Sequence, residues 1–186
     1  MLFMQLSQPF FVIADPHLYH KTMERRGWRP EGYTEMIIDN WRNRVNDDDL
    51  IFVLGDVCFD IKRCRKVIPE LPGHKILIKG NHDHWSKGRI WKLGFELIVD
   101  DMIMVRYYLG GGKRFKNVVM SHYYYSKREL GGKLPVRDFI LIHGHSHTKR
   151  PFVDVSVPAV NVCAEYLEYS PWSIDEILSV VKSRGR

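Results

Sequence analysis

The chain has 186 residues, of which 45% are hydrophobic and 12% aromatic, and its formal net charge is +6. This length predicts one compact domain spanning residues 1–186, with enough apolar material for a substantial core. Disordered, collagen-like and coiled-coil proteins are excluded by the unexceptional composition. The basic balance favours anionic partners such as nucleotides, phosphate esters or nucleic acid, but it does not choose between them.

The cysteines and the N-terminus indicate the cellular compartment. Cys58, Cys64 and Cys163 are an odd number without paired spacing, so we expect no disulfide framework and a reducing environment. The apolar stretch at the N-terminus follows no basic residue and is interrupted by polar residues and Pro9. Neither a signal peptide nor a membrane span is therefore expected. We predict a cytoplasmic protein with no membrane partner.

Short apolar runs, each followed by a turn, dominate the first half of the chain. Strands are predicted at residues 10–14, 50–54 and 76–78. Apolar residues recur at helical spacing between residues 34 and 45, which predicts an amphipathic helix, and a shorter helix is expected at 62–69. Strand and helix therefore alternate in this half.

The second half reads mainly as β-structure. Strands are predicted at residues 97–99, 102–108, 115–120, 139–142, 153–155 and 159–163. A glycine-rich turn at 110–113 would join two of them. A final helix is expected at 173–182, where Ser173 and Glu176 have the spacing of a capping box. Together the two halves predict an α/β protein with two sheets and helices outside.

Five polar motifs lie at or beside the ends of the predicted strands or in adjoining turns. They are Asp15-x-His17, Gly55-Asp56, Gly80-Asn81-His82-Asp83, Ser121-His122 and Gly144-His145-Ser146-His147. Loops at the carboxyl ends of strands gather functional groups from distant parts of a sequence. Carboxylates, imidazoles and an amide oxygen suit divalent Mn, Fe or Zn, and the lack of cysteine points away from a structural zinc site. Each motif alone is weak, but the ordered set predicts a metal site.

These motifs, in this order, resemble those of the calcineurin-like metallophosphoesterase superfamily, especially its small single-domain microbial and phage members. The resemblance extends from about residue 15 to residue 161. It implies a two-sheet β-sandwich flanked by helices, the four-layer αββα metallophosphoesterase fold. The chain departs from the family at 123–125, where three tyrosines stand in place of a frequent proline. It also lacks the Asp-Arg-Gly sequence that protein serine/threonine phosphatases carry after the bridging aspartate.

The resemblance implies seven ligands for two divalent metal ions. One ion would be held by Asp15, His17 and His147, the other by Asn81, His122 and His145, and Asp56 would bridge both. Manganese is the first expectation, with Fe, Zn, Ni, Co or Mg as alternatives. Ions roughly 3.5–4 Å apart can activate a shared hydroxide and clamp the phosphate oxygens.

Other polar residues near these motifs receive separate interpretations. We expect His82 to stabilise the transition state or protonate the leaving oxygen, with Asp83 orienting its ring. His143 is interpreted as a supporting or packing residue. Surface or loop positions are expected for His20, His74 and His84. Cys58 is expected to be a small core residue, and the aspartates at 47–49 a solvated turn.

The predicted function is hydrolysis of a phosphodiester or phosphomonoester through a metal-bridging hydroxide, on a small nucleotide-like or other phosphorylated substrate. The alternatives are a nuclease acting on DNA or RNA and a non-catalytic scaffold, although the complete ligand set weighs against scaffolding. Basic, aromatic segments at 106–116 and 123–133 motivate the nuclease hypothesis. A structural hairpin is favoured for the first segment, and the second is left open between a substrate shelf and a structural role. A homodimer that shapes the pocket is a further hypothesis.

Overall fold

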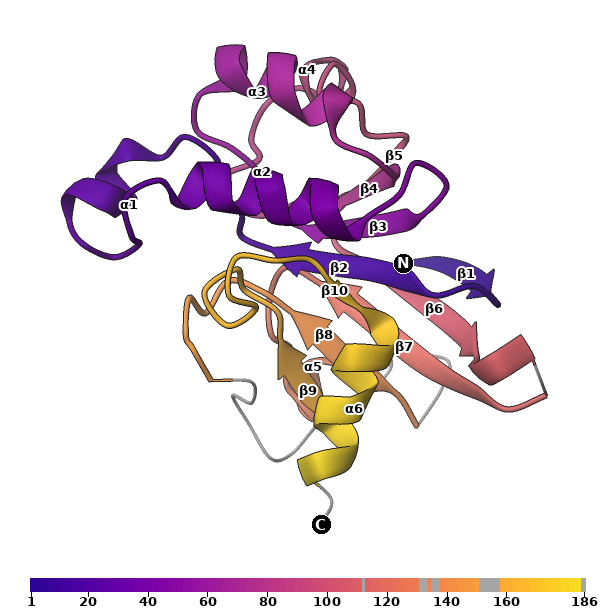
Figure 1. The fold of residues 1–186 in the computed structure, drawn as a ribbon. Helices are drawn as coiled ribbons and strands as arrows, with labels where there is room; N and C mark the ends of the chain where they lie inside the picture. The colour runs from indigo at the N-terminus through magenta and orange to yellow at the C-terminus, as the bar shows by residue number, and fades with distance from the viewer. Residues whose placement is uncertain (112, 131–133, 135–137, 151–157, 185–186) are drawn as a thin grey trace.

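Two five-stranded mixed sheets form the centre of the molecule in the computed structural model (Figure 1). It describes residues 1–111, 113–130, 134, 138–150 and 158–184. The first sheet has the order β10 (Trp172–Ser173), β2 (Phe10–Ala14), β3 (Leu50–Leu54), β4 (His74–Ile78) and β5 (Leu97–Val99). The second has the order β1 (Leu2–Leu6), β6 (Met102–Tyr108), β7 (Phe115–Ser121), β8 (Ile140–His143) and β9 (Ala159–Asn161).

Helices flank the two sheets, as the sequence predicted. Helices α2 (Tyr33–Arg44), α3 (Ile61–Val67) and α4 (Lys87–Trp91) cover the outer face of the first sheet (Figure 1). The short helix α5 (Lys127–Leu130) lies against the second sheet, and α6 (Ile174–Arg184) contacts β2 and β10. The remaining helices are α1 (Lys21–Arg25) and the 3₁₀ turns η1 (Ile68–Glu70) and η2 (Leu109–Gly111). No helix in the described ranges is long and apolar enough to cross a membrane.

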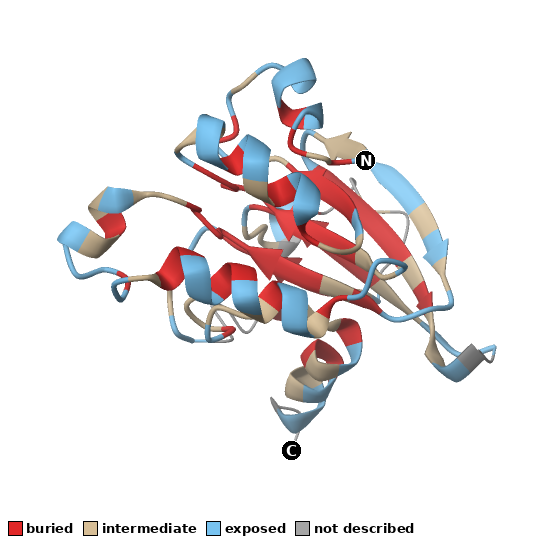
Figure 2. Cartoon of the chain, turned by 45° about the horizontal axis from the view of Figure 1, so that its top comes forward, coloured by how far each residue is buried: buried red, intermediate tan, exposed pale blue. Residues whose placement is uncertain are grey.

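The burial of the strands explains their sequence patterns. Strands β2 and β3 and the last three residues of β4 read as continuous apolar runs because helices cover one face of their sheet and the second sheet covers the other (Figure 2). In β6 the side chains alternate between two cores. Ile103 and Val105 face the main core between the sheets, whereas Met102 and Met104 join a smaller cluster with Leu130 of α5.

Most predicted elements are present, with boundaries shifted by one or two residues. The capping box is confirmed, because the Ser173 N–H donates to Glu176 over 2.8 Å and the Glu176 N–H donates to Ser173 Oγ over 3.3 Å. Strand β9 ends at Asn161, two residues earlier than expected, and the strand predicted at 153–155 lies outside the described residues. The sequence pattern does not predict β1, β10, α1, α4 or α5. Strand β1 exists through parallel pairing with β6, a partner about 100 residues away that local pattern does not reveal.

The topology brings the five polar motifs to one end of the molecule. Strands β2, β3 and β4 are mutually parallel, and so are β7 and β8, so the carboxyl ends of each set lie at one edge of their sheet. The two edges are joined where the Ala14 N–H donates to the carbonyl of Val162 over 2.9 Å. The basic hairpin lies elsewhere, because β6 and β7 are antiparallel and Tyr108 pairs with Phe115 at the strand ends far from Ser121. The structural interpretation of that hairpin is therefore favoured.

Candidate functional site

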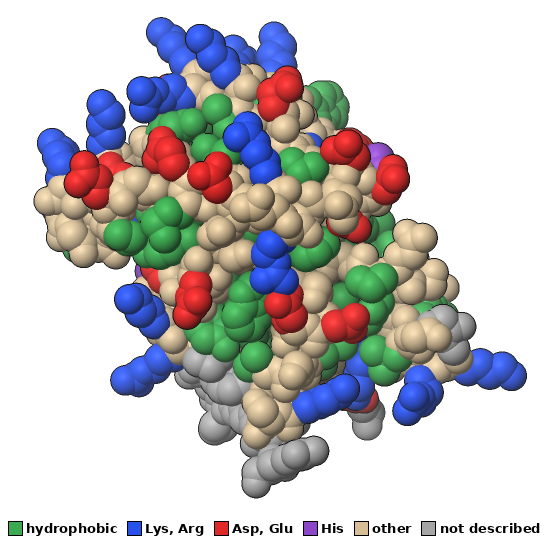
Figure 3. All heavy atoms as spheres, in the orientation of Figure 1, with side chains coloured by type: hydrophobic (Ala, Val, Ile, Leu, Met, Phe, Trp, Pro, Cys, Tyr) green, Lys and Arg blue, Asp and Glu red, His purple; other side chains and the backbone are tan. Residues whose placement is uncertain are grey.

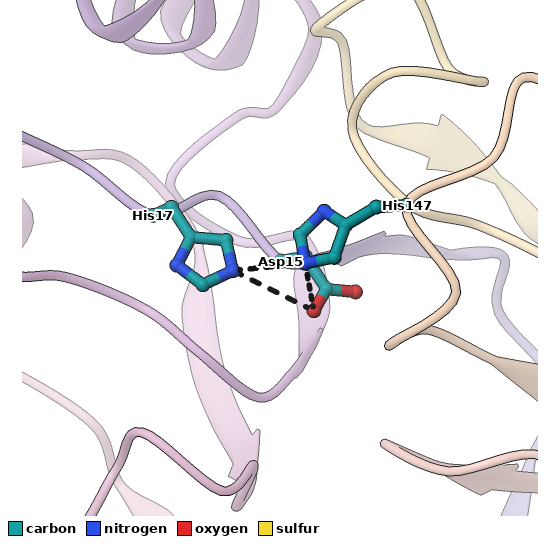
Figure 4. A group of neighbouring side chains, drawn as sticks. All are labelled: Asp15, His17 and His147. Atoms are coloured by element: carbon teal, nitrogen blue, oxygen red, sulfur yellow. Dashed lines mark hydrogen bonds and ion pairs between the residues drawn. The ribbon is translucent and has the colours of Figure 1, made fainter. Parts of the chain in front are cut away.

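Three of the predicted ligands point toward one another, with Asp15 and His17 from the turn after β2 and His147 from the turn after β8 (Figure 4). The Nε2 atoms of His17 and His147 are 3.2 Å apart, and they lie 3.9 and 3.7 Å from Asp15 Oδ1. That oxygen is buried and has no hydrogen-bond partner in the described part of the chain. Ligands of a small octahedral cation, at about 2.1 Å from it, lie about 3 Å from their neighbours. The spacing and the unpartnered oxygen therefore fit a bound cation.

A second ligand group lies beside the first. His122 Nε2 is 3.0 Å from Asn81 Oδ1 and 3.1 Å from His145 Nδ1. Asp56 Oδ2 lies 3.7 Å from this nitrogen and 3.6 Å from His17 Nε2 in the first group. The structure thus brings all seven predicted ligands together, with Asp56 between the two groups.

The backbone at the ligands adopts an uncommon conformation. Five ligands have positive φ angles of 45° to 67°, and they are Asp15, His17, Asp56, His145 and His147. Such a conformation costs of order 1–3 kcal/mol for a residue other than glycine and persists only where the surrounding structure imposes it. Clustering of this strain at the ligands is typical of a functional site.

Glycine is required in the motifs because neighbouring backbone and side-chain atoms lie too close to admit a Cβ. Gly55 has φ of 77°, and a Cβ there would lie 2.5 Å from both the Gly80 nitrogen and the His122 ring. A Cβ on Gly80 would overlap the carboxylate of Asp56, and one on Gly144 would overlap that of Asp15. These glycines therefore allow the turns to pack directly against the ligand carboxylates.

Hydrogen bonds behind the ligands fix their orientation. The Nδ1–H of His122 donates to the carbonyl of Leu54 over 2.9 Å, which leaves Nε2 as the nitrogen that faces the site. The Nδ1–H of His147 likewise donates to Glu165 over 3.0 Å. Histidine with its second nitrogen held in this way is typical of metal sites.

Arg29 is a supporting residue that sequence reasoning missed. The residue is buried, with 2% of its surface exposed. Its Nε and Nη2 atoms lie 2.8 and 2.7 Å from one oxygen of Glu165. It also donates to the carbonyls of Pro16 and Asp15 over 2.8 and 2.7 Å. Arg29 thus connects the first ligand turn to Glu165 and, through Glu165, to His147. No motif in the sequence marks it, because its partners are distant along the chain.

Burial and neighbouring charges shift the pKa values of the first ligand group. Burial raises the pKa of Asp15 to about 6, although His122 and His147 act in the opposite direction. Burial and the Arg29 charge lower the pKa of His17, which keeps its ring neutral. Burial alone would lower the pKa of His147, but its hydrogen bond with Glu165 and the charge of Asp15 raise it overall. A desolvated carboxylate beside neutral imidazole is an environment that a cation stabilises.

His82 and Asp83 occupy different environments. The exposed ring of His82 has Nε2 at 4.0 Å from Asp56 Oδ2, and its backbone N–H donates to Asp56 Oδ1 over 2.8 Å. Asp83 is buried and accepts from the backbone N–H groups of Asp56, Val57 and Gly80 over 2.7, 3.0 and 2.9 Å. Within the described chain its carboxylate makes no hydrogen bond with the His82 ring. The orienting role expected for Asp83 is corrected accordingly: it holds the Gly55 and Gly80 turns together.

The other histidines also have defined places. His20 lies in a loop, as expected, and its ring stacks on Phe59 at a centroid distance of 3.5 Å and lines a cavity of about 620 Å³. His143 is buried with its ring 5.4 Å from that of Tyr124, as a packing residue would be. His74 and His84 are exposed, and Cys58 is buried, as expected.

The tyrosine-rich segment that follows His122 borders the second ligand group. The ring centroid of Tyr123 is 4.8 Å from those of both His122 and His145. The hydroxyl of Tyr125 donates to Asp101 over 2.7 Å, which attaches the segment to the start of β6. Residues 131–133 at its end lie outside the described ranges. A role for Tyr123 beside the substrate stays a prediction.

Comparisons with known proteins agree with this geometry. Residues 8–176 match the family model of the calcineurin-like phosphoesterases. The chain is 24% identical over 185 residues to the uncharacterized protein MJ1445 of Methanocaldococcus jannaschii, covering 92% of this chain and 90% of that protein. It is 27% identical over 162 residues to the gene 66 protein of Mycobacterium phage D29, covering 77% and 80%. Among solved structures, AQ665 from Aquifex aeolicus, a protein of unknown function, superposes with a TM-score of 0.75 at 27% identity, covering 92% of this chain and 98% of that one. The chain therefore belongs to the calcineurin-like phosphoesterase family and is a metal-dependent hydrolase of phosphate esters.

Proposed function

We propose that the two ligand groups hold two divalent metal ions and that the enzyme hydrolyses a phosphodiester or phosphomonoester of a small molecule. The position of Asp56 carries this proposal. Its Oδ2 lies 3.6 Å from His17 and 3.7 Å from His122, which belong to different ligand groups. One carboxylate oxygen at that point can bind two ions, so the donor set fits a dinuclear centre better than two unrelated sites.

Different residues would bind the metal ions and assist the departure of the leaving group. The metal ions would supply an activated water and neutralise the charge of the phosphate. Asp15, Asp56 and the five neutral donors would hold them, with manganese as the first candidate. His82 faces the cavity without being committed to either ligand group, so its ring is free to stabilise the transition state or protonate the leaving oxygen.

A small-molecule substrate agrees with the space beside the site. The cavity of about 620 Å³ is within the range of about 300–1,000 Å³ that small-molecule sites occupy. Nucleic acid is the second candidate because the chain is basic. On the face seen in Figure 3, however, Lys and Arg side chains are scattered among Asp and Glu and do not gather in one stripe. The basic hairpin between β6 and β7 also lies at the strand ends far from the ligands.

The test compares hydrolysis of bis(4-nitrophenyl) phosphate and 4-nitrophenyl phosphate by metal-stripped protein before and after addition of Mn. We expect turnover only with metal, and binding of two ions per chain. His82→Ala should lower kcat by about 10²–10⁴-fold, as loss of a general acid does. His84→Ala is the matched control, because this neighbouring histidine is exposed and is not among the described residues that line the cavity.

The outcomes separate the candidate functions. Equal turnover in the His82→Ala and His84→Ala variants would remove His82 from the mechanism. Binding of a single ion at saturation would contradict the dinuclear centre. Cleavage of single-stranded DNA or RNA faster than either small ester would favour the nuclease. Two bound ions without turnover on a broad panel of esters would favour a scaffold.

A further inference from the structure

The cavity beside the first ligand group has an aromatic wall that the proposed chemistry does not use. Alongside His17, His82 and His147, its lining includes Met23, His20 and Trp28. The only lysine or arginine among the described lining residues is Lys149. The lining therefore combines predicted metal ligands and the charged Lys149 and Glu165 with three flat or apolar side chains.

His20, which lines the cavity, is held by a ring stacked on it close to the ligands. His20 and Phe59 lie almost parallel, with an interplanar angle of 8° and centroids 3.5 Å apart. The Phe59 centroid is 5.3 Å from that of His17 and 5.1 Å from that of His82. This stack is thus in contact distance of both the first ligand group and the proposed general acid.

Trp28 also lines the cavity, and its backbone is held by Met23 before it and by Arg29 after it. The residue is 58% exposed although it is a large aromatic side chain. Its backbone N–H donates to the carbonyl of Met23 over 2.9 Å, and the next residue is the buried Arg29 that binds the first ligand turn. The Trp28 backbone is therefore anchored next to a residue that contacts the first ligand turn, and such support suits a substrate-binding residue.

We propose that this wall is a subsite for the base of a nucleotide whose phosphate lies at the metal ions. The inference rests on the proposed function and adds the substrate class to it. Aromatic side chains bind any nucleobase through its flat face, so the subsite would be tolerant of base identity. The ammonium group of Lys149 would add attraction for the phosphate.

Two diesters with the same leaving group test the subsite, namely thymidine 5′-(4-nitrophenyl phosphate) and methyl 4-nitrophenyl phosphate. We expect wild-type protein to prefer the thymidine ester in kcat/KM, and Trp28→Ala to reduce that preference by about tenfold. Trp28→Phe should restore part of it, because a ring remains. Trp91→Ala is the matched control, since Trp91 is also 58% exposed but lies on α4 and does not line the cavity. An unchanged preference in Trp28→Ala would overturn the proposal.

A binding measurement makes the test independent of turnover. Calorimetric titration of the Mn-loaded protein with thymidine 5′-monophosphate and with ribose 5-phosphate should show tighter binding of the nucleotide, and Trp28→Ala should bring the two affinities together. Nucleotide preference without hydrolysis of any ester would support the subsite and contradict the proposed function. Hydrolysis with equal affinities would support the function and reject the subsite.

Discussion

Arg29→Met removes the buried guanidinium that joins the first ligand turn to Glu165. The variant keeps most of the hydrocarbon stem but leaves the Glu165 carboxylate, whose side chain is 8% exposed, without its cationic partner. Removing one member of a buried ion pair costs about 3–5 kcal/mol. The carbonyls of Pro16 and Asp15 also lose a charged donor, which contributes to the same loss. We expect the free energy of unfolding to fall by about 3–5 kcal/mol and Tm to fall by about 10 °C.

The assay is urea unfolding of metal-stripped protein, monitored by circular dichroism. The free energies of unfolding of the variants are compared using a common m value. Arg44→Met is the matched control, because the Arg44–Glu176 pair has the same charges but side chains that are 34% and 40% exposed. An exposed pair of this kind contributes about 0–1 kcal/mol. If both variants lose the same stability, or if Arg29→Met loses less than about 1 kcal/mol, the assignment of Arg29 as a buried anchor of the site is refuted.

Four further predictions concern the site itself. Because burial raises the pKa of Asp15 to about 6, a proton competes with the metal there, and metal affinity should fall as the pH drops below about 6. A constant affinity between pH 5 and 8 in calorimetric titrations would contradict this. Because the folded pKa lies above the unfolded value of 3.8, metal-stripped protein should lose about 2 kcal/mol of stability as the pH rises from about 4 to 6. Asp15→Asn should remove that loss in urea titrations at the two pH values. Glu165→Gln should weaken metal binding by about 10–100-fold by releasing the ring that Glu165 holds, and an unaltered dissociation constant would argue against this support. Gly80→Ala should displace the bridging carboxylate and abolish turnover, whereas Gly88→Ala, whose Cβ would meet nothing within 4 Å, should keep full activity; equal activities would show that the close approach is dispensable.

The sequence by itself indicated the central strands and the candidate ligands. Strands β2 and β3 and residues 76–78 of β4 could be predicted because they are buried apolar runs between the helices and the second sheet. The ligands could be predicted because each motif follows such a run and offers the side chains that divalent ions bind. Apolar runs and ligand motifs are both formed by residues that are neighbours in the sequence, so both can be recognised without the structure.

The tertiary structure alone decided how the site is supported. Arg29 and Glu165 are separated by 136 residues, and nothing around either position indicates that the two side chains meet. Asp83 stands next to His82 in sequence, yet its carboxylate binds the backbone N–H of Gly80 in its own turn and that of Asp56 in the turn after β3. Strand β1 pairs with β6 despite an exposed and irregular sequence. A hydrogen bond or ion pair depends on where folding brings its partner, and for these residues the partner is set by the packing of the two sheets.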